Sequence, residues 1–426
     1  MNIIRMPQHF VVYEHSRVLK ISSKSEFKNR NEEADIFVPK TVFELLKQQT
    51  FTSEADTVLQ FSVRKGEEQI RFKNYIGILQ LADGSRFEVL PKIAQDRDVP
   101  TARRSFLKML RQLPEAPFKS LSTAALSAVS LPVWEIFITA FIEEMEQIAR
   151  QGIQKAYQTV ENEETFVRGK WLPHRQNAIR PELLFTEHDL FTSDILPNRL
   201  LKTCVLALFK QSRHLSNQIK LRQLRFIMEG VQASVDFRSD FNLLQLPDRR
   251  FDRYTRVLQW AKILLNQQSW AGGGYCVNES LLFPAERLFE NYVARGCRNY
   301  LAEWEVIYQD SLHFLVEEHA GQRRFGLRPD LVIRRGNKTV VLDVKWKRIE
   351  PHLPNYGIEQ SDLYQLYAYG RKYHTDELLL IYPAHETFQT PLLPFHFDNQ
   401  LKLTILPFDL TQSWESEIKK IEASCR

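Results

Sequence analysis

Two apolar runs near the C-terminus, residues 331–335 and 339–345, are separated by a Gly-Asn pair at 336–337. Apolar runs around a two-residue turn that contains glycine predict a β-hairpin. Counting outward from this turn places Asp330 opposite Asp343, with Cβ atoms about 4.5–5.5 Å apart. Two like charges that face each other on an apolar hairpin are destabilising unless something compensates for them. The pair therefore constrains both the fold and the chemistry of this region.

A divalent cation between the two carboxylates is the natural compensation, and oxygen ligands suit Mg²⁺ or Mn²⁺. Lys345 follows Asp343 by two residues, so it projects from the same face of the strand toward that ion. An ammonium beside two metal-bound carboxylates can orient a water, help to deprotonate it, and stabilise charge on a phosphorane. These features favour metal-assisted phosphodiester hydrolysis. The simpler alternative is a salt bridge at the rim of the sheet between Lys345 and one of the aspartates.

Three further residues are candidates for the same site. Glu290 lies on an amphipathic helix predicted over residues 284–300, from which a third carboxylate could reach the metal. Gln365 and Tyr369 are spaced i, i+4 on a helix predicted over residues 361–373, so both can hydrogen-bond a phosphate or brace the lysine. The alternatives stay open at this point: Glu290 is a solvated helix charge, and the other two form a polar-aromatic surface stripe.

The order of these features (an acidic helix, Pro-Asp, Asp-x-Lys and then Gln-x-x-x-Tyr) resembles the PD-(D/E)xK nuclease superfamily, particularly its RecB-like branch. The wider chain is more specifically similar to McrC, the nuclease subunit of McrBC-type modification-dependent restriction systems. The similarity extends over most of the length, and it rests on the order of short stretches along one chain. These are residues 75–81, 88–93, 167–171, 196–202, 287–293, 327–333, 342–347 and 362–369.

The resemblance implies a metal-dependent DNA endonuclease subunit. By analogy, Asp330 and Asp343 bind Mg²⁺ (or Mn²⁺) with the Val344 backbone carbonyl and Glu290, and Lys345 is the catalytic lysine. The N-terminal and middle regions dock onto a hexameric McrB-like AAA+ GTPase and stimulate its hydrolysis. Recognition of modified cytosine in double-stranded DNA belongs to that GTPase. The sequence has no G-x-x-x-x-G-K-[ST] phosphate loop, so this chain itself is expected to bind no nucleotide.

Two other functions fit the same motifs. One is a stand-alone RecB-like repair nuclease, although a self-sufficient enzyme of this type has little need for the roughly 270 residues that precede the nuclease domain. The other is a non-catalytic adaptor or activator of an AAA+ motor. A binding scaffold has no need of Asp330, Asp343 and Lys345 together, which argues against the adaptor.

The chain has 426 residues, more than one ordinary domain needs. Its pattern predicts a multidomain α+β protein, with a flexible break at residues 272–274. The predicted parts are a β-rich partner-docking domain (1–125), a helical middle region (126–274), and a C-terminal α/β domain of the PD-(D/E)xK restriction-endonuclease-like type (275–426). Apolar runs at 75–81 and 87–91 around Asp83-Gly84 predict a hairpin in the first part. Further helices are predicted at 101–113, 133–156, 198–211, 215–229 and 248–268, and further strands at 305–308, 312–317 and 378–382.

Composition excludes some classes of protein. The formal net charge is +5, and the excess is uneven: residues 199–262 hold 13 Lys or Arg against 5 Asp or Glu. This stretch either tracks a phosphate backbone or forms solvated helix faces. The four cysteines form no C-x-x-C pair, which argues against a zinc ribbon or a disulfide framework. No apolar run approaches the length of about 18 residues that spans a bilayer, and the N-terminus does not resemble a signal peptide. We therefore expect a soluble cytoplasmic protein with no membrane partner.

Overall fold

The computed structural model describes residues 8–21, 35–51, 58–94, 98–113, 117–122, 128–176, 179–246, 249–266 and 280–425. The chain divides into two compact units. The first combines Met1–Val133 with Gln268–Arg426, and the second is Trp134–Gln267. The division into three domains with the boundaries given above stays a prediction, and the glycines at 272–274 lie outside the described residues.

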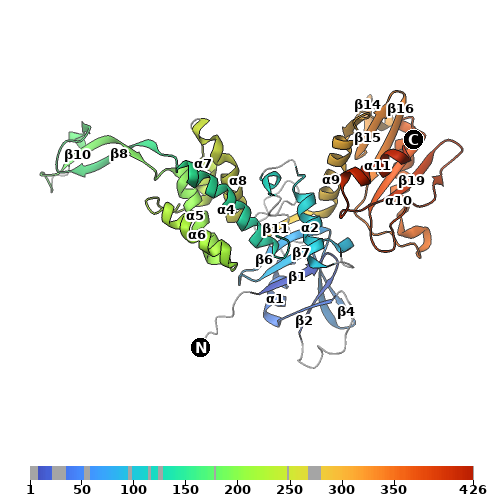
Figure 1. Cartoon of the computed structure of the whole chain (residues 1–426), viewed down its shortest axis with the longest axis horizontal. Helices are drawn as coiled ribbons and strands as arrows, with labels where there is room; N and C mark the ends of the chain where they lie inside the picture. The colour runs from blue at the N-terminus through green and yellow to red at the C-terminus, as the bar shows by residue number, and fades with distance from the viewer. Residues whose placement is uncertain are drawn as a thin grey trace. The chain divides into compact units, whose positions relative to one another are not determined.

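Two four-stranded sheets and a helix make up the N-terminal part of the first unit (Figure 1). One sheet has the order β1-β7-β6-β11 and the other β3-β2-β5-β4. The elements are β1 (His9–Tyr13), β2 (Arg17–Lys20), β3 (Asp35–Val38), α1 (Lys40–Gln49), β4 (Leu59–Arg64), β5 (Glu67–Phe72), β6 (Tyr75–Gln80), β7 (Arg86–Leu90) and β11 (Ser280–Pro284). The predicted hairpin around Asp83-Gly84 is confirmed, because β6 and β7 pair antiparallel across it.

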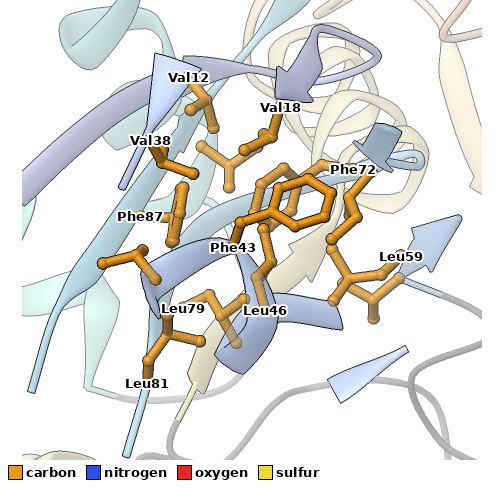
Figure 2. Packing of buried hydrophobic residues seen from close by; sticks show 14 of the residues in the cluster. Val12, Val18, Val38, Phe43, Leu46, Leu59, Phe72, Leu79, Leu81 and Phe87 are labelled. Carbon is orange, nitrogen blue, oxygen red and sulfur yellow. The ribbon is translucent and has the colours of Figure 1, made fainter. Parts of the chain in front are cut away.

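The two sheets share one apolar core, shown in Figure 2. Val12 and Phe87 come from the first sheet and Phe72 from the second, while Phe43 and Leu46 come from α1. All five side chains are buried. Helix α1 places Phe43 and Leu46 on one face because three residues are close to one helical turn. A helix thus closes the core between the two sheets. The short helix η3 (Lys92–Ala94), α2 (Val99–Leu110) and η4 (Phe118–Ser120) follow β7 along the chain.

Strand β11 ties the C-terminal part of the chain to this N-terminal sheet. It pairs antiparallel with β6, and Leu282 lies opposite Gly77. Gly77 has a φ of +134°, and a Cβ there would lie 2.0 Å from the Leu281 carbonyl oxygen, so only glycine permits this approach. Helix α9 (Ala285–Tyr300) begins directly after β11, and the Ala285 N–H donates to the carbonyl of Asn74. A strand of the N-terminal sheet, β11, therefore leads directly into α9, the first helix of the C-terminal part.

The C-terminal part of the first unit is built on a six-stranded mixed sheet with the order β12-β15-β16-β17-β19-β18. β16, β17 and β19 run parallel, whereas the other neighbours pair antiparallel. The elements are β12 (Glu305–Tyr308), β13 (Phe314–His319), β14 (Gln322–Gly326), β15 (Leu331–Arg335), β16 (Lys338–Val344), η7 (Pro354–Gly357), α10 (Gln360–Lys372), β17 (Glu377–Pro383), β18 (Phe395–His396), β19 (Lys402–Phe408) and α11 (Trp414–Ser424). The predicted bounds of β12 and β15 are confirmed. Those of β16, α10 and β17 differ by one residue at each end, and α9 begins one residue later than predicted and ends as predicted.

Helices cover both faces of this sheet. On one face, Leu366 and Tyr369 of α10 share a buried cluster with Val341 and Leu380. On the other face, α9 and α11 pack together, and the Phe289 ring of α9 contacts Phe408. Residues of one parity along a strand face one layer, and those of the other parity face the second layer. Asp343 and Lys345 share the parity of Val341, so they belong to the α10 face.

The second unit is only partly helical, which corrects the prediction of a helical middle region. Its helices are joined by a long antiparallel hairpin of β8 and β10, to which β9 adds a third strand. In Figure 1 this hairpin extends away from the helices of its own unit. The elements are α4 (Val133–Gln151), β8 (Ala156–Glu164), β9 (Lys170–Trp171), η5 (Pro173–Arg175), β10 (Leu184–Thr192), α5 (Leu196–Gln211), α6 (Leu215–Ile227), α7 (Phe237–Leu243), η6 (Arg249–Tyr254) and α8 (Thr255–Asn266).

Several basic side chains of residues 199–262 are held within their own unit. Arg199 pairs with Asp194 at 2.9 Å, and Lys220 pairs with Glu146 at 3.0 Å. Lys202 donates to the Met228 carbonyl at 2.9 Å. Whether this stretch meets a phosphate backbone stays a prediction. Cys204, Cys297 and Cys425 are free and buried, and no helix among the described residues is both long and apolar enough to cross a membrane.

Candidate active site

The β15–β16 hairpin has the register that the sequence predicts. Leu331 pairs with Leu342 and Arg335 with Lys338, on either side of a turn that begins at Gly336. Gly336 has a φ of +58°, which the first central position of a tight hairpin turn favours. Extending this register by one residue sets Asp330 against Asp343 at the open end of the hairpin.

Backbone hydrogen bonds fix both aspartates to the sheet. The Asp330 side chain accepts a hydrogen bond from the Val344 N–H through Oδ2 at 2.7 Å, and its carbonyl accepts one from the Gln309 N–H at 3.0 Å. Asp343 is only 2% exposed. The Lys345 N–H donates to the Ile381 carbonyl at 2.9 Å, so the extended chain continues past the end of β16. The carboxylates are therefore held on rigid strands.

Lys345 lies over the same centre. Its Nζ is 2.9 Å from Asp343 Oδ2, and its side chain is 15% exposed. A salt bridge between the lysine and one aspartate is thus present, as in the simpler alternative. It differs from a rim salt bridge because Asp343 is buried and because a second carboxylate stands opposite.

The electrostatics of the pair show incomplete compensation. Burial and the Asp343 carboxylate raise the pKa of Asp330 to about 7, against the lowering effect of the Val344 N–H and Lys345. Burial raises the pKa of Asp343, although Lys345 opposes it. Burial alone would lower the pKa of Lys345, but the Asp343 carboxylate outweighs it and raises that pKa. One ammonium therefore does not neutralise the two carboxylates, and the centre is poised to accept a further cation.

Glu290 faces this centre from α9. Burial, followed by the charges of Asp330, Glu286 and Asp343, raises its pKa to about 8, against the lowering effect of Lys345. Glu290 is partly buried, which disfavours the alternative of a fully solvated helix charge. Among the described residues, however, no three His, Cys, Asp or Glu side chains form a group that could hold a metal ion. A direct role for Glu290 as a metal ligand stays a prediction.

Gln365 and Tyr369 interact with each other on α10. The Gln365 Nε2 donates to the Tyr369 hydroxyl at 2.7 Å. Tyr369 is 2% exposed, so it does not belong to a surface stripe, whereas Gln365 is exposed and the alternative stays open for it. Burial and the Asp343 charge raise the pKa of Tyr369 to about 12, so its hydroxyl keeps its proton near neutral pH. Tyr369 therefore offers a hydroxyl on the same side of the sheet as Asp343.

The structure brings further residues to the site that the sequence did not single out. Glu286 precedes Glu290 by one helical turn, and that i, i+4 spacing was a readable signal. Asp362 of α10 forms a salt bridge at 2.9 Å with Lys347, which lies two residues after Lys345 and has the same parity. The buried Tyr382 hydroxyl finds no hydrogen-bond partner among the described residues, and its pKa is raised by burial and then by Asp362. No local pattern in the sequence marks Tyr382, because the parallel pairing of β17 with β16 brings it to the site.

The donor set of this centre fits a hard divalent cation. Asp330 and Asp343 supply carboxylate oxygens, which Mg²⁺ and Mn²⁺ prefer. Mg²⁺ is commonly held by one or two carboxylates and keeps several waters, so two protein carboxylates are sufficient. The raised pKa of both aspartates is the electrostatic counterpart of this fit, because a cation would relieve the repulsion between them.

Two solved structures are similar to this chain, and the first of them agrees with this architecture over nearly the whole length. A chain from the refined half-complex of a tetradecameric assembly of Thermococcus gammatolerans McrB AAA+ hexamers with bound McrC is similar in fold, with a TM-score of 0.70 and 18% sequence identity. That match covers 97% of this chain and 100% of the other. A chain from the cryo-EM structure of the Thermococcus gammatolerans McrBC complex matches with a TM-score of 0.48 and 19% identity, over 70% of this chain and 89% of the other.

Sequence comparison gives the family. No curated protein matches the chain. The model of the family described as McrBC 5-methylcytosine restriction system component matches residues 70–383. This span includes Asp330, Asp343 and Lys345, and it begins within the N-terminal sheets. Because the match covers more than half of the chain, the protein belongs to the McrBC 5-methylcytosine restriction system component family.

Proposed function

We propose that this chain is an McrC-like nuclease subunit, which cleaves DNA phosphodiester bonds with Mg²⁺ or Mn²⁺ when it is assembled with an AAA+ GTPase. The observation that carries the proposal is the buried centre of Asp330, Asp343 and Lys345. Its two facing carboxylates share one ammonium at the open end of a hairpin. This arrangement corresponds to the PD-(D/E)xK type of nuclease domain. Neither a non-catalytic adaptor nor a structural salt bridge needs the second carboxylate.

The residues divide the chemistry between them. Asp330 and Asp343 would hold the metal, with the Val344 carbonyl beside them and Glu290 as a further carboxylate. A bound divalent cation supplies activation of water and neutralisation of the phosphate charge. Lys345 keeps its proton, because its pKa is raised. It therefore acts as a fixed positive charge that orients the attacking water and stabilises the phosphorane, rather than as a base. Gln365 and Tyr369 position the phosphate from α10.

The proposed partner follows from family membership and fold. The chain is similar to one from an assembly of McrB AAA+ hexamers with bound McrC. We infer that this protein likewise binds a hexameric McrB-like GTPase, stimulates its GTP hydrolysis, and acts on double-stranded DNA that carries modified cytosine. Dependence on a motor has a regulatory logic, since an unrestrained nuclease would cut host DNA.

Plasmid cleavage tests the proposal. The full chain is incubated with Mg²⁺ and GTP on plasmids with and without cytosine modification, in the presence and absence of the AAA+ protein encoded beside it. The variants are Lys345→Ala and, as a matched control, Lys338→Ala. Lys338 lies on the same strand and pairs with Glu377 at 2.9 Å, away from the two aspartates. We expect cutting of modified plasmid only, dependent on partner and GTP, lost in Lys345→Ala and retained in Lys338→Ala.

Each other outcome selects a different function. Cutting without partner or nucleotide would identify a stand-alone RecB-like nuclease. An absence of cutting across a panel of cytosine modifications, with GTP hydrolysis still stimulated, would identify a non-catalytic activator of the motor. Equal cutting by wild type and Lys345→Ala would remove the lysine from the active site.

A further inference from the structure

The chain that carries the active-site lysine has a second face. Asp343, Lys345 and Lys347 share one parity of the extended segment and face the α10 layer. Trp346 has the opposite parity, and its ring contacts the Phe289 ring of α9 with centroids 5.2 Å apart. Its exposed fraction is 3%. A residue adjacent to the lysine is thus buried on the far side of the sheet.

A carboxylate from the other end of the chain meets Trp346 there. The Trp346 Nε1 donates to Glu14 Oε1 at 2.6 Å, across 332 positions of sequence. The same oxygen accepts the Lys92 N–H at 3.1 Å. The Lys92 ammonium donates in turn to the Trp346 carbonyl at 3.5 Å. Both the side chain and the backbone of Trp346 are therefore held by residues of the N-terminal part of the chain.

Glu14 itself is anchored in a tight turn between β1 and β2. Its N–H donates to the Leu90 carbonyl at 3.0 Å, and the next residue, His15, has a φ of +67°. The His15 ring bonds Asn74, whose carbonyl accepts the first N–H of α9, that of Ala285. One turn of the N-terminal sheets thus contacts the residue after Lys345 directly, and it is linked through Asn74 to the start of the helix that carries Glu290.

The environment of Glu14 is costly for a merely structural contact. Glu14 is 1% exposed, and its Oε2 accepts no hydrogen bond from any described residue. The Lys92 ammonium faces it, whereas the ring of His15, 3.9 Å away, has a pKa that burial and Lys92 lower, so it adds no positive charge near neutral pH. Burial raises the pKa of Glu14, whereas Lys92 and the Trp346 indole lower it. Replacing a buried ionic arrangement by apolar residues is often neutral or stabilising. Stability alone therefore does not explain why Glu14 and Lys92 are buried next to the segment that carries Lys345.

We propose that Glu14 is a positioning residue, which holds Trp346 and thereby sets the place of Lys345 over the Asp330–Asp343 pair. We refer to the contacts among Glu14, Lys92 and Trp346 as the Glu14 joint. This inference rests on the proposed nuclease function. It adds that the N-terminal sheets support the active site directly, so a partner bound to those sheets acts on the lysine through a hydrogen bond and one peptide unit.

Three variants separate positioning from folding. Trp346→Phe removes the indole donor and keeps a ring against Phe289. Glu14→Ala removes the acceptor, whereas Glu14→Gln keeps a carbonyl oxygen in its place. The matched control is Trp304→Phe, since Trp304 is 5% exposed and its Nε1 has no hydrogen-bond partner among the described residues. All are assayed as full chains with the AAA+ partner, Mg²⁺, GTP and modified plasmid.

We expect Trp346→Phe and Glu14→Ala each to lower kcat by roughly 10- to 100-fold, the loss typical of an ångström-scale misplacement of a catalytic group. KM for DNA should stay within about twofold, because uniform binding is not altered. The double variant should be no slower than either single variant, since both remove one contact. Glu14→Gln and Trp304→Phe should retain most activity, and all variants should stimulate GTP hydrolysis normally.

A second readout does not depend on cleavage. The Trp346 indole N–H should exchange slowly with solvent in the wild type and in Lys345→Ala, and rapidly in Glu14→Ala, as measured by NMR of ¹⁵N-tryptophan protein. Wild-type cleavage by Trp346→Phe, additive losses in the double variant, or equal loss in Trp304→Phe would each overturn the positioning role while the nuclease function stood. If the wild type never cuts, the nuclease function fails and the positioning role falls with it. In that case slow indole exchange would leave the Glu14 joint as a structural contact.

Discussion

Buried carboxylates occur in the first unit in two settings, and the chain treats them differently. Glu88 of the N-terminal sheet is 1% exposed and receives Arg103 through two hydrogen bonds, at 2.5 and 3.1 Å, and His9 at 2.9 Å. Burial would raise the pKa of Glu88, but His9 and Arg103 outweigh it and hold that pKa below its usual value. At the open end of the β15–β16 hairpin, Asp330 and Asp343 share one lysine, and both pKa values are raised.

The difference separates a structural ion pair from the centre proposed to be the active site. Arg103 also donates to the Val129 and Ser130 carbonyls. The ion pair therefore links α2 both to β7, which carries Glu88, and to residues 129–130. The aspartates have an excess of negative charge that the protein alone does not neutralise. The depressed pKa of Glu88 fits an ion pair that holds the fold together, whereas the raised pKa values of two facing aspartates fit the site proposed for a ligand or a reaction.

The largest expected effect is a loss of cleavage without a loss of stability, at Asp343. Asp343→Asn should lower plasmid cleavage by about 10³-fold or more, because a metal site is worth several kcal/mol of transition-state stabilisation. Its thermal unfolding should be no worse than that of the wild type, since a like charge has been removed. Single-turnover cleavage and calorimetry of the same samples test both statements. Retained cleavage would mean that Asp343 is not a metal ligand.

Glu88→Gln should do the opposite. It leaves the Arg103 guanidinium buried with a weaker partner, and breaking a buried ion pair in this way costs about 3–5 kcal/mol. Urea unfolding should show that loss, while cleavage per folded molecule with partner stays close to the wild-type rate at a temperature where the variant is folded. An unchanged unfolding midpoint would show that Glu88 and Arg103 do not form a structural pair.

The pH dependence of stability should differ in sign between the two regions. Asp330 has a folded-state pKa raised from 3.8 to about 7, so between these values the folded state binds more protons and its stability falls as pH rises. Glu88 has a lowered pKa, so its contribution is lost as pH falls. In EDTA at pH 8, Asp330→Asn should therefore be more stable than the wild type by about 1–3 kcal/mol.

This advantage of Asp330→Asn should shrink as pH falls and vanish below about pH 4, where the wild-type carboxyl becomes protonated in the unfolded state as well. Unfolding by urea at several pH values measures it. Added Mg²⁺ should stabilise the wild type and narrow the gap at pH 8, because only the wild type keeps both carboxylates. A gap that is constant across this range would mean that the Asp330 pKa is not raised.

The two regions also differ in how well they can be predicted from sequence. The Asp330–Asp343 pairing is local, because a two-residue turn at Gly336 fixes the register of the strands on both sides. The contact of Glu14 with Trp346 spans 332 positions, and no pattern in either segment announces it. Pairing of β11 with β6 is similarly distant, and only the glycine at position 77 hints that another backbone comes close.

The sequence does not predict the β8–β10 hairpin, for a different reason. Sequence patterns detect a strand when one face is apolar and buried. The β8 strand carries polar residues at most positions, and neither strand is covered along its full length. Backbone hydrogen bonds hold the two strands together, and such bonds produce no alternation of apolar and polar residues in the sequence. Because strongly periodic helices flank this segment, the sequence predicts a helical region there.

The smallest expected effect concerns how the α10 layer supports the centre. Gln365 donates to the hydroxyl of the buried Tyr369, whereas Gln360, on the same helix, donates to the hydroxyl of Tyr364, which is 66% exposed. A neutral hydrogen bond contributes about 1 kcal/mol, so Gln365→Ala should lower kcat by roughly 2- to 10-fold without altering the unfolding midpoint. Gln360→Ala, the matched loss on the exposed side, should leave kcat unchanged. Equal rates for the two variants would mean that the Tyr369 hydroxyl needs no help from Gln365, and the Asp343 face of the sheet would then be organised by the strands alone.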